Sequence, residues 1–477
     1  MMRIEDLKNK PIAVLGYGQE GEAVAKYLIK HRLEPVLFDQ RPWDKWPKKK
    51  QEVIKKLGIN FIFGPDCFKE LAGFEVAFRS PGIPLSHPDL LNWPNLMFTS
   101  QTKWFFEHCP AKIIGVTGTK GKGTTSALIY QILLTNNYSL PTNVYFTGNI
   151  GKDQPLDFLD DLKSEDWVIY ELSSFQLQDL TKSPHIAVVL MTTSEHLDYH
   201  KDNEEYQQAK NSITMFQTNN DFAIINADYP ASVKIGEQGK GMKFYFSARK
   251  ELERGCYIKD SQLIVIDVLG KNFQYPISNI QLRGRHNLEN VSAAVSAGAL
   301  LKIGGSVIQQ AIDGFKGLEH RLEFVAEKQG IKFYNDSFST TPETAIAAIK
   351  SFDETLIVIL GGSKKNSDFR ELGKTISRTK NIKALILIGQ EALIIKRAIL
   401  SFSSPPGEEG GEGGRTDADK TPLILESAKD MKDIFNQIKQ IAAPGDIVLL
   451  SPACASFDMF KNYEDRGKQF KKLAADF

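Results

Sequence analysis

The sequence predicts an α/β protein of three domains with mainly parallel sheets. Short apolar runs that suit strands alternate with helical patterns along almost the whole chain of 477 residues. Three of these runs, residues 12–15, 113–116 and 356–360, end directly in a glycine-rich turn. A strand that runs into such a turn and a helix opens a doubly wound α/β unit. Three openings therefore predict three domains.

We place the domain boundaries where this pattern restarts. The first domain would span residues 1–110, the second 111–320 and the third 321–477. Residues 402–420, FSSPPGEEGGEGGRTDADK, are rich in Pro, Gly and Glu and almost free of apolar side chains. Such a composition cannot build a packed core, so we expect a disordered surface insertion in the last domain.

Composition excludes several classes of protein. The chain is 42% hydrophobic and 25% charged, and its net charge is +1, which gives no electrostatic case for nucleic acid or an anionic membrane. No apolar run approaches the ~20 residues of a membrane span, and the start, MMRIEDLKNKP, lacks the apolar core of a signal peptide. The four cysteines are scattered, which fits a reducing cytoplasm and argues against a cysteine-built metal site.

The first glycine turn has the form of a dinucleotide fingerprint. In VLGYGQEG, Gly16, Gly18 and Gly21 follow a strand and precede a helix, and Asp39 ends the next strand, PVLFD. Alone, this pattern suggests NAD(P) or a purely structural tight turn. A second nucleotide loop follows about a hundred residues later, and the pair favours two different phosphorylated ligands.

The second glycine turn, IIGVTGTKGKGTT at residues 113–125, predicts a phosphate-binding loop. Its backbone N–H groups and the following helix N-terminus would bind phosphate, and Lys122 would reach the terminal phosphates of a nucleotide. The loop departs from G-x-x-x-x-G-K-[ST] twice. Val116 replaces the first glycine and Gly123 replaces the hydroxyl residue, with hydroxyls arriving at Thr124 and Thr125.

Polar side chains end the next two predicted strands. Glu171 ends WVIYE, and IAVVLMTTSEHLDYH ends in a group that includes His196. Ligands bind at this carboxyl edge of parallel sheets, and Mg²⁺ prefers oxygen ligands there. Lys210, in EEYQQAKNSI, has by composition the character of a solvated helix lysine.

The last domain carries three polar clusters. They are Asn335-Asp336-Ser337 after KFY, GGSKKNSDF at residues 361–369, and LLSPACASFDMFKNYEDRG at residues 449–467. The paired lysines, Lys364 and Lys365, suit either a solvated loop or a site for an anionic substrate group.

These segments together resemble the Mur ligase family, the ATP-dependent amino-acid ligases of peptidoglycan precursor synthesis. The similarity runs from about residue 10 to 475 and is carried by SPGIPLSHP, TGTKGKGTT, GNIG, ELSSFQL, EHLDYH, RHNLEN, EHRLE, NDS and LLSPACASFD. The strings SPGI, ELSSFQL and SPACASFD favour the branch that adds D-glutamate. The resemblance implies a Rossmann-like N-terminal domain for the UDP-substrate, a central P-loop ATPase-like domain for ATP, and a Rossmann-like C-terminal domain for the amino acid.

The resemblance also implies the chemistry. ATP, with Mg²⁺, would convert the carboxylate of UDP-N-acetylmuramoyl-L-alanine to an acyl phosphate, and the amine of D-glutamate would displace phosphate. Such transfer needs positioned phosphates, cations and in-line geometry. We expect a cytoplasmic monomer with no nucleic-acid or membrane partner.

The site residues follow from the matching motif positions. The catalytic set is Lys122, Glu171, His196 and Lys210, the last matching a lysine that family members carry as a carbamate. The ATP set is Gly118, Thr119, Lys120, Gly121, Lys122, Gly123, Thr124, Asn287, Arg321 and Asp336. The UDP-substrate set is Gly16, Gly18, Gly21, Asp39, Arg41, Ser80, Asn149 and Ser173. The amino-acid set is Thr340, Lys365, Ser456 and Phe457, and the metal set is Glu171, His196, carbamylated Lys210 and Thr124.

Two departures bear on specificity. Gly123 removes a direct Mg²⁺ ligand, which water can replace, and Phe338 in NDSFSTT stands where many relatives have lysine (NDSKAT). A different amino-acid specificity, as in another Mur ligase or a folylpolyglutamate synthase-like ligase, is therefore the alternative. An NAD(P)-dependent oxidoreductase would leave Lys122 unexplained, and a non-catalytic nucleotide-binding regulator would explain Gly123 and Phe338.

Overall fold

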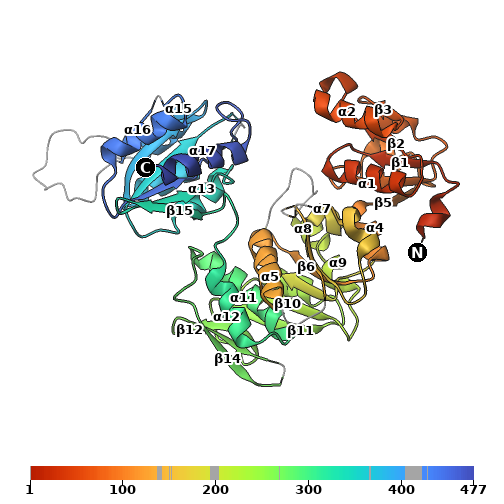
Figure 1. Cartoon of the computed structure of the whole chain (residues 1–477), viewed down its shortest axis with the longest axis horizontal. Coiled ribbons are helices and arrows are strands. Elements are labelled where there is room, and N and C mark those ends of the chain that lie inside the picture. Colours follow the sequence, from red (N-terminus) through yellow and green to blue (C-terminus); the bar gives the residue numbers. More distant parts are fainter. Residues whose placement is uncertain are drawn as a thin grey trace, which may run out of the picture. The chain divides into compact units, whose positions relative to one another are not determined.

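The computed structural model describes residues 2–136, 142–149, 151, 153–193, 203–267, 269–364, 367–402, 422–426 and 428–477. Its helices and mostly parallel strands confirm the predicted α/β class (Figure 1). The chain forms two compact units. The first comprises Met1–Asn279 with Glu289–Asp313, and the second comprises Ile280–Leu288 with Gly314–Phe477. The predicted insertion at 402–420 lies almost entirely outside the described residues.

The first sheet of unit 1 is wholly parallel. Its strand order is β3 (Phe61–Phe63), β2 (Val36–Asp39), β1 (Ile12–Leu15), β4 (Val76–Arg79) and β5 (Met97–Thr99). The helices of this part are α1 (Gln19–Lys30), α2 (Lys48–Leu57), α3 (Pro88–Leu91) and α4 (Gln101–His108). All four residues of β1 are buried, as expected for a central strand covered on both faces. The order is doubly wound, so β1 and its turn lie at the ligand-binding edge.

The second sheet of unit 1 contains the phosphate-loop strand as an interior strand. Its strands in order are β14 (Asn272–Pro276), β13 (Gln262–Ile266), β12 (Gly255–Lys259), β11 (Met242–Ser247), β10 (Phe222–Asn226), β9 (Ile186–Val189), β6 (Lys112–Thr117), β8 (Trp167–Glu171) and β7 (Val144–Gly148). The pairs from β7 to β12 are parallel, and β12, β13 and β14 form an antiparallel end.

The helices of this second sheet complete unit 1. They are α5 (Lys122–Asn136), α6 (Pro155–Phe158), α7 (Ser174–Leu177), α8 (Asn203–Gln208), α9 (Ser212–Met215), α10 (Pro230–Gly236), α11 (Arg285–Leu300) and α12 (Gly305–Gly314), with the first residues of α11 assigned to unit 2. Among the helices of the described ranges, none has the length and apolarity needed to cross a membrane.

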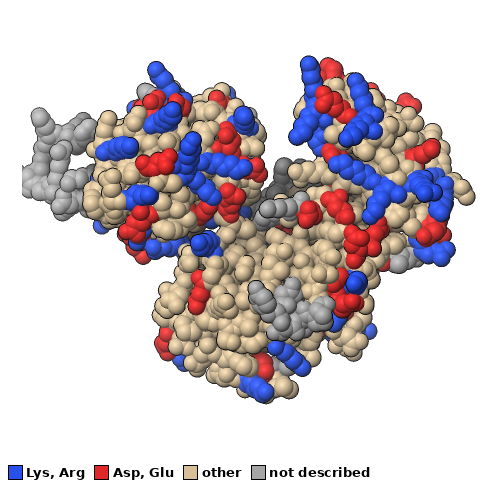
Figure 2. All heavy atoms as spheres, viewed as in Figure 1, with Lys and Arg blue, Asp and Glu red and all other residues tan. Residues whose placement is uncertain are grey.

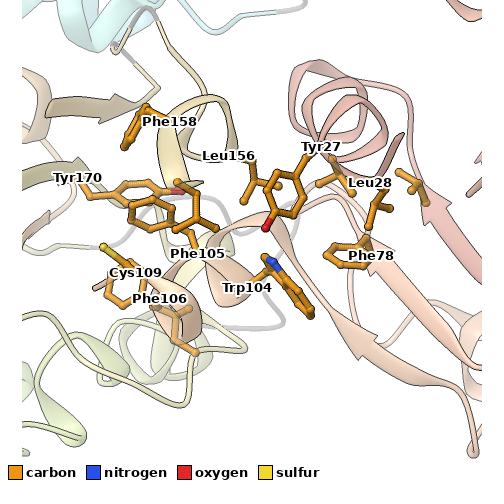
Figure 3. Packing of buried hydrophobic residues seen from close by; sticks show 14 of the residues in the cluster. Tyr27, Leu28, Phe78, Trp104, Phe105, Phe106, Cys109, Leu156, Phe158 and Tyr170 are labelled. Carbon is orange, nitrogen blue, oxygen red and sulfur yellow. The ribbon is translucent and has the colours of Figure 1, made fainter. Parts of the chain in front are cut away.

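A continuous apolar core joins the two sheets of unit 1. Helix α4 supplies Trp104, Phe105 and Phe106, all at most 1% exposed. Figure 3 shows these rings between Tyr27 of α1 and Tyr170 of β8. The rings of Phe105 and Tyr170 pack edge to face with centroids 5.7 Å apart. Burial of several large aromatic side chains contributes strongly to stability, so this core fixes the first sheet against the second.

Unit 2 is built on a six-stranded sheet. Its order is β15 (Glu323–Lys328), β16 (Ile331–Asn335), β20 (Ile447–Leu450), β17 (Leu356–Gly361), β18 (Ile382–Ile388) and β19 (Leu423–Leu425). Only the edge strand β15 is antiparallel to its neighbour. The helices are α13 (Pro342–Ile349), α14 (Arg370–Arg378), α15 (Ala392–Leu400), α16 (Met431–Ile441) and α17 (Tyr463–Ala475). Acidic and basic side chains are interspersed over the visible surface (Figure 2).

Candidate active site

The glycine turn after β6 has a conformation suited to phosphate. Gly118 and Gly121 have φ angles of +153° and +91°, which glycine adopts readily. A Cβ atom on Gly121 would lie 2.2 Å from Oδ1 of Asn290, so close packing also requires glycine there. Lys122 opens α5, and its Nζ donates to the carbonyl oxygens of Gly118 (2.9 Å) and Thr119 (3.1 Å). The ammonium thus lies against the turn whose backbone N–H groups can bind phosphate.

Two residues without a predicted role, Asn290 and Tyr206, hold this turn in place. The Thr125 hydroxyl donates to Oδ1 of Asn290 on α11 over 3.3 Å. The Thr119 hydroxyl lies 3.2 Å from the hydroxyl of Tyr206 on α8. Both partners are far from the loop in the chain, so no local pattern could have identified these contacts.

The structure brings Glu171 beside the loop. Glu171 ends β8, pairs in register with Val116 of β6, and is 4% exposed. Just beyond it, Leu172 accepts a hydrogen bond at its carbonyl from the Thr117 hydroxyl (2.9 Å). The adjacent strand ends therefore place one carboxylate next to the phosphate-binding turn, as predicted for a parallel sheet.

Lys210 is buried, so its interpretation as a solvated helix lysine is wrong. The residue follows α8 and is 1% exposed. Its Nζ lies 4.4 Å from the centroid of the Tyr206 ring, and Tyr206 contacts Thr119 in the loop. Lysine is almost never fully buried unless its charge is compensated. One side chain, Tyr206, therefore separates Lys210 from the phosphate-binding turn.

The oxygen donors at this place suit Mg²⁺. The predicted ligands Glu171 and Thr124 supply a carboxylate and a hydroxyl, and both residues are buried, with 4% and 3% exposed. Mg²⁺ is usually held by one or two carboxylates together with substrate phosphates, so this donor set fits it. Within the described ranges, no group of three or more His, Cys, Asp or Glu could hold a metal ion. His196 lies outside those ranges.

The first glycine turn is braced by Asp39 and Ser80. The Asp39 carboxylate accepts hydrogen bonds from the backbone N–H groups of Tyr17 (2.7 Å) and Arg41 (2.8 Å). The Ser80 hydroxyl donates to the carbonyl of Gly16 (3.1 Å). A Cβ on Gly21 would approach that same carbonyl oxygen to 1.9 Å, which excludes any larger residue. Asp39 therefore shapes the turn, and its oxygens are already occupied by backbone donors.

A cavity lies between the first glycine turn and the second sheet. It is a small hollow that is open to solvent on one side. Asn149, from the predicted UDP-substrate set, lines it together with Glu20 and Gln176. Ser173, from the same set, caps α7 instead, since its hydroxyl accepts from the N–H of Gln176 over 3.3 Å.

In unit 2, Asp336 is the most perturbed of the predicted residues. Burial raises the pKa of its carboxyl to about 7, although hydrogen bonds from Ser451 and from the N–H of Leu322 act in the opposite direction. Those bonds measure 2.8 and 3.1 Å. A perturbed, buried carboxyl at a strand end is typical of a functional site.

Asn287 and Arg321, the other residues of unit 2 that are predicted to bind ATP, have different neighbours. Asn287 donates from Nδ2 to the carbonyl of Arg283 over 2.6 Å. The guanidinium of Arg321 lies 5.0 Å from the ring centroid of Phe338, and Phe338 packs edge to face on Tyr463. Phe338 is 44% exposed and therefore presents an apolar surface beside the NDS segment.

The structure describes only part of the set of residues predicted to bind the amino-acid substrate. Ser456 is buried and Phe457 is 74% exposed, while Thr340 is half-buried and Lys365 lies outside the described ranges. Sequence reasoning missed Arg466, which is fully buried. Its guanidinium donates to the carbonyls of Ser337 (2.9 Å) and Cys454 (3.1 Å). Arg466 therefore ties the NDS segment to the SPACAS segment, and only a three-dimensional contact shows it.

Two protein-family domains and several full-length proteins are similar to this chain in sequence. Residues 116–298 match the Mur ligase middle domain, and residues 320–454 match the Mur ligase glutamate ligase domain. A UDP-N-acetylmuramoylalanine–D-glutamate ligase from Acetivibrio thermocellus is 37% identical over 98% of this chain and 96% of its own length. One of the same name from Thermoanaerobacter sp. is 35% identical over 99% of both chains.

Solved structures share the fold at much lower identity. MurF from Acinetobacter baumannii superposes with a TM-score of 0.58 at 15% identity, covering 100% of this chain and 93% of that one. The UDP-N-acetylmuramate–alanine ligase MurC from Thermotoga maritima gives 0.57 at 14% identity, covering 98% and 100%. Near-full-length relatives above 30% identity, two matching domains and a shared fold agree on one conclusion. The chain belongs to the Mur ligase family.

Proposed function

We propose that this protein is an ATP-dependent, ADP-forming ligase that joins D-glutamate to UDP-N-acetylmuramoyl-L-alanine in peptidoglycan precursor synthesis. The observation that carries the proposal is the phosphate-binding turn with Lys122 and Glu171 at adjacent strand ends, in a chain whose full-length relatives bear that activity in their names. We place the reaction in the cytoplasm and expect a monomer.

In this proposal the residues of unit 1 serve phosphoryl transfer. The N–H groups of the 118–124 turn and the N-terminus of α5 orient the phosphates, and the Lys122 ammonium offsets the charge that develops on the transferred group. Glu171, Thr124, His196 and carbamylated Lys210 would hold Mg²⁺, which supplies charge neutralisation when bound. The substrate carboxylate gains the phosphoryl group as the bond to ADP breaks. The amine then attacks the carbonyl carbon, loses a proton, and phosphate leaves.

The remaining assignments concern substrate recognition. Residues 1–110 would bind the UDP moiety, 111–320 ATP, and 321–477 the amino acid. Asn287, Arg321 and Asp336 would complete the ATP site, and Lys365, Thr340, Ser456 and Phe457 would bind D-glutamate. We assign Phe338 to an apolar wall of that pocket, because its exposed ring already packs on Tyr463.

The decisive experiment measures ADP release from the purified protein. We expect release only when ATP, Mg²⁺, UDP-N-acetylmuramoyl-L-alanine and D-glutamate are all present, with Lys122→Ala as the inactive control. A panel of amino acids in place of D-glutamate tests the alternative specificity that Phe338 raises. Preference for another amino acid would replace D-glutamate in the proposal and keep the ligase. Nicotinamide reduction without ADP release would favour an oxidoreductase instead.

A further inference from the structure

The cavity beside the first glycine turn contains hydrogen-bond acceptors that lack donors. Glu20 is half-buried as a residue, but its Oε2 atom is shielded from solvent, and no donor within the described ranges reaches it. Gln101 is 2% exposed, and its Oε1 atom is likewise shielded from solvent and reached by no donor among the described residues. Both residues line the cavity. A buried acceptor without a donor is unfavourable, so both oxygens favour a ligand that supplies donors.

Three polar groups of the cavity lining already take part in hydrogen bonds. Nε2 of Gln176 donates to the other carboxylate oxygen of Glu20, Oε1, over 2.8 Å. Nε2 of Gln101 donates to Oε1 of Gln154 over 3.2 Å. The Tyr170 hydroxyl is paired with that of Thr102 at 3.1 Å. These bonds fix the orientation of Glu20 and Gln101 and leave acceptor capacity at the oxygens named above.

The described lining of the cavity offers no positive charge to an anionic occupant. Among the described residues that line it, none is lysine or arginine. The nearest cation that acts on Glu20 is Arg79, which is engaged with Asp179 at 3.3 Å. A phosphate or carboxylate placed in the cavity would lie beside the Glu20 carboxylate, and no described lining residue would neutralise its negative charge. A neutral group with hydroxyl or N–H donors fits this environment.

We propose that Glu20 is a specificity-determining residue that, with Gln101, accepts hydrogen bonds from the sugar hydroxyl and N-acetyl N–H groups of the UDP-sugar substrate. This inference rests on the proposed function and assigns the cavity to the sugar, leaving the diphosphate to the backbone N–H groups of the Gly16–Gly21 turn. Glu20 belongs to that turn, so the two parts of one ligand would bind side by side. In this proposal Glu20 contacts the sugar of the substrate directly and does not serve only to complete the glycine turn.

Proton linkage provides an independent readout. Burial raises the pKa of the Glu20 carboxyl to about 7. The hydrogen bond from Gln176 and the charge of Arg79 lower it, and the charge of Asp179 raises it further. A ligand that donates to the carboxylate favours the ionised form and lowers this pKa. Binding must then release about half a proton at pH 7, and affinity must weaken as the pH falls below 7. An anionic group inside the cavity would have the opposite effect, because it would raise this pKa and take up protons.

The test is titration calorimetry of UDP-N-acetylmuramoyl-L-alanine and of UDP, in two buffers of different ionisation enthalpy at pH 7. We expect the wild type to release protons with the sugar substrate only. Glu20→Gln should abolish this release and weaken the sugar substrate about tenfold to hundredfold, with UDP affected less than about twofold. Glu22→Gln is the matched control, since Glu22 is in the same helical turn but pairs with Lys26 and Lys50.

Other results of these measurements would contradict either the role of Glu20 or the proposed function. Equal weakening of UDP and the sugar substrate, proton uptake, or unchanged binding in Glu20→Gln would overturn the role of Glu20 while the ligase function stands. A wild type that neither binds UDP-N-acetylmuramoyl-L-alanine nor turns it over would overturn the proposed function, and this inference with it. Thermal unfolding of Glu20→Gln separates lost binding from lost folding, because a binding role predicts an unchanged midpoint.

Discussion

Replacing Arg466 with methionine tests whether unit 2 depends on one buried guanidinium. Methionine keeps most of the apolar stem but removes the donors to the carbonyls of Ser337 and Cys454. Each buried carbonyl left without its partner costs about 1–3 kcal/mol, so we expect a loss of about 2–6 kcal/mol. For a unit of this size, about 2–4 °C per kcal/mol predicts that the unfolding transition of unit 2 falls by at least about 4 °C.

The assay combines calorimetric unfolding with steady-state kinetics. Because Arg466 connects the segments that carry Asp336 and Ser456, the KM for D-glutamate should rise more than that for the UDP-substrate. Arg466→Lys keeps the charge but not the planar fork of donors, so it should recover only part of the loss. Lys468→Met, on the exposed face of α17, controls for the removal of a cation. An unchanged transition, or equal changes in both KM values, would refute the reasoning.

The remaining predictions concern three lysines. Lys122→Ala should lower turnover by about 10²–10³ with an unchanged circular dichroism spectrum; near-normal turnover would contradict its role at the transferred phosphoryl group. Lys210→Ala should lose most activity and partly regain it with added acetate, whereas full activity without acetate would exclude a carbamate ligand. Lys365→Ala should raise the KM for D-glutamate about ten- to two-hundred-fold, and an effect on ATP alone would assign the lysine to the nucleotide.

The fold could be predicted because its signals are local. An apolar strand such as residues 12–15, followed by glycines with required positive φ or close contacts, specifies its own turn. The same holds for the turn at Gly118–Gly121 and for Glu171, since the ends of parallel strands meet at one edge. The two glycine turns depend on near neighbours in the chain, whereas Glu171 reaches the loop through the parallel pairing of β6 with β8. The structure confirms that these features form as predicted.

The supporting residues could not be predicted because their partners are distant in the chain. Asn290 contacts Thr125 across 165 positions, and Arg466 contacts Ser337 across 129. No role was predicted for Glu20, yet its carboxyl accepts a hydrogen bond from Gln176, 156 positions away. The packing of the first sheet on the second brings Glu20 and Gln176 together at the cavity that both line.

Lys210 shows how burial changes the meaning of a residue. Its sequence neighbours are polar, and by composition it resembles any helix lysine. With 1% exposure, its ammonium loses hydration, and the fold must offset that cost. Tyr206 faces it with its ring and reaches Thr119 with its hydroxyl, so a change of charge on Lys210 acts one side chain from the phosphate-binding turn. An unmodified lysine would add a cation there, whereas a carbamate would add oxygen ligands. Mass spectrometry of the intact protein cannot retain so labile a group, which is why acetate rescue is the sharper measurement.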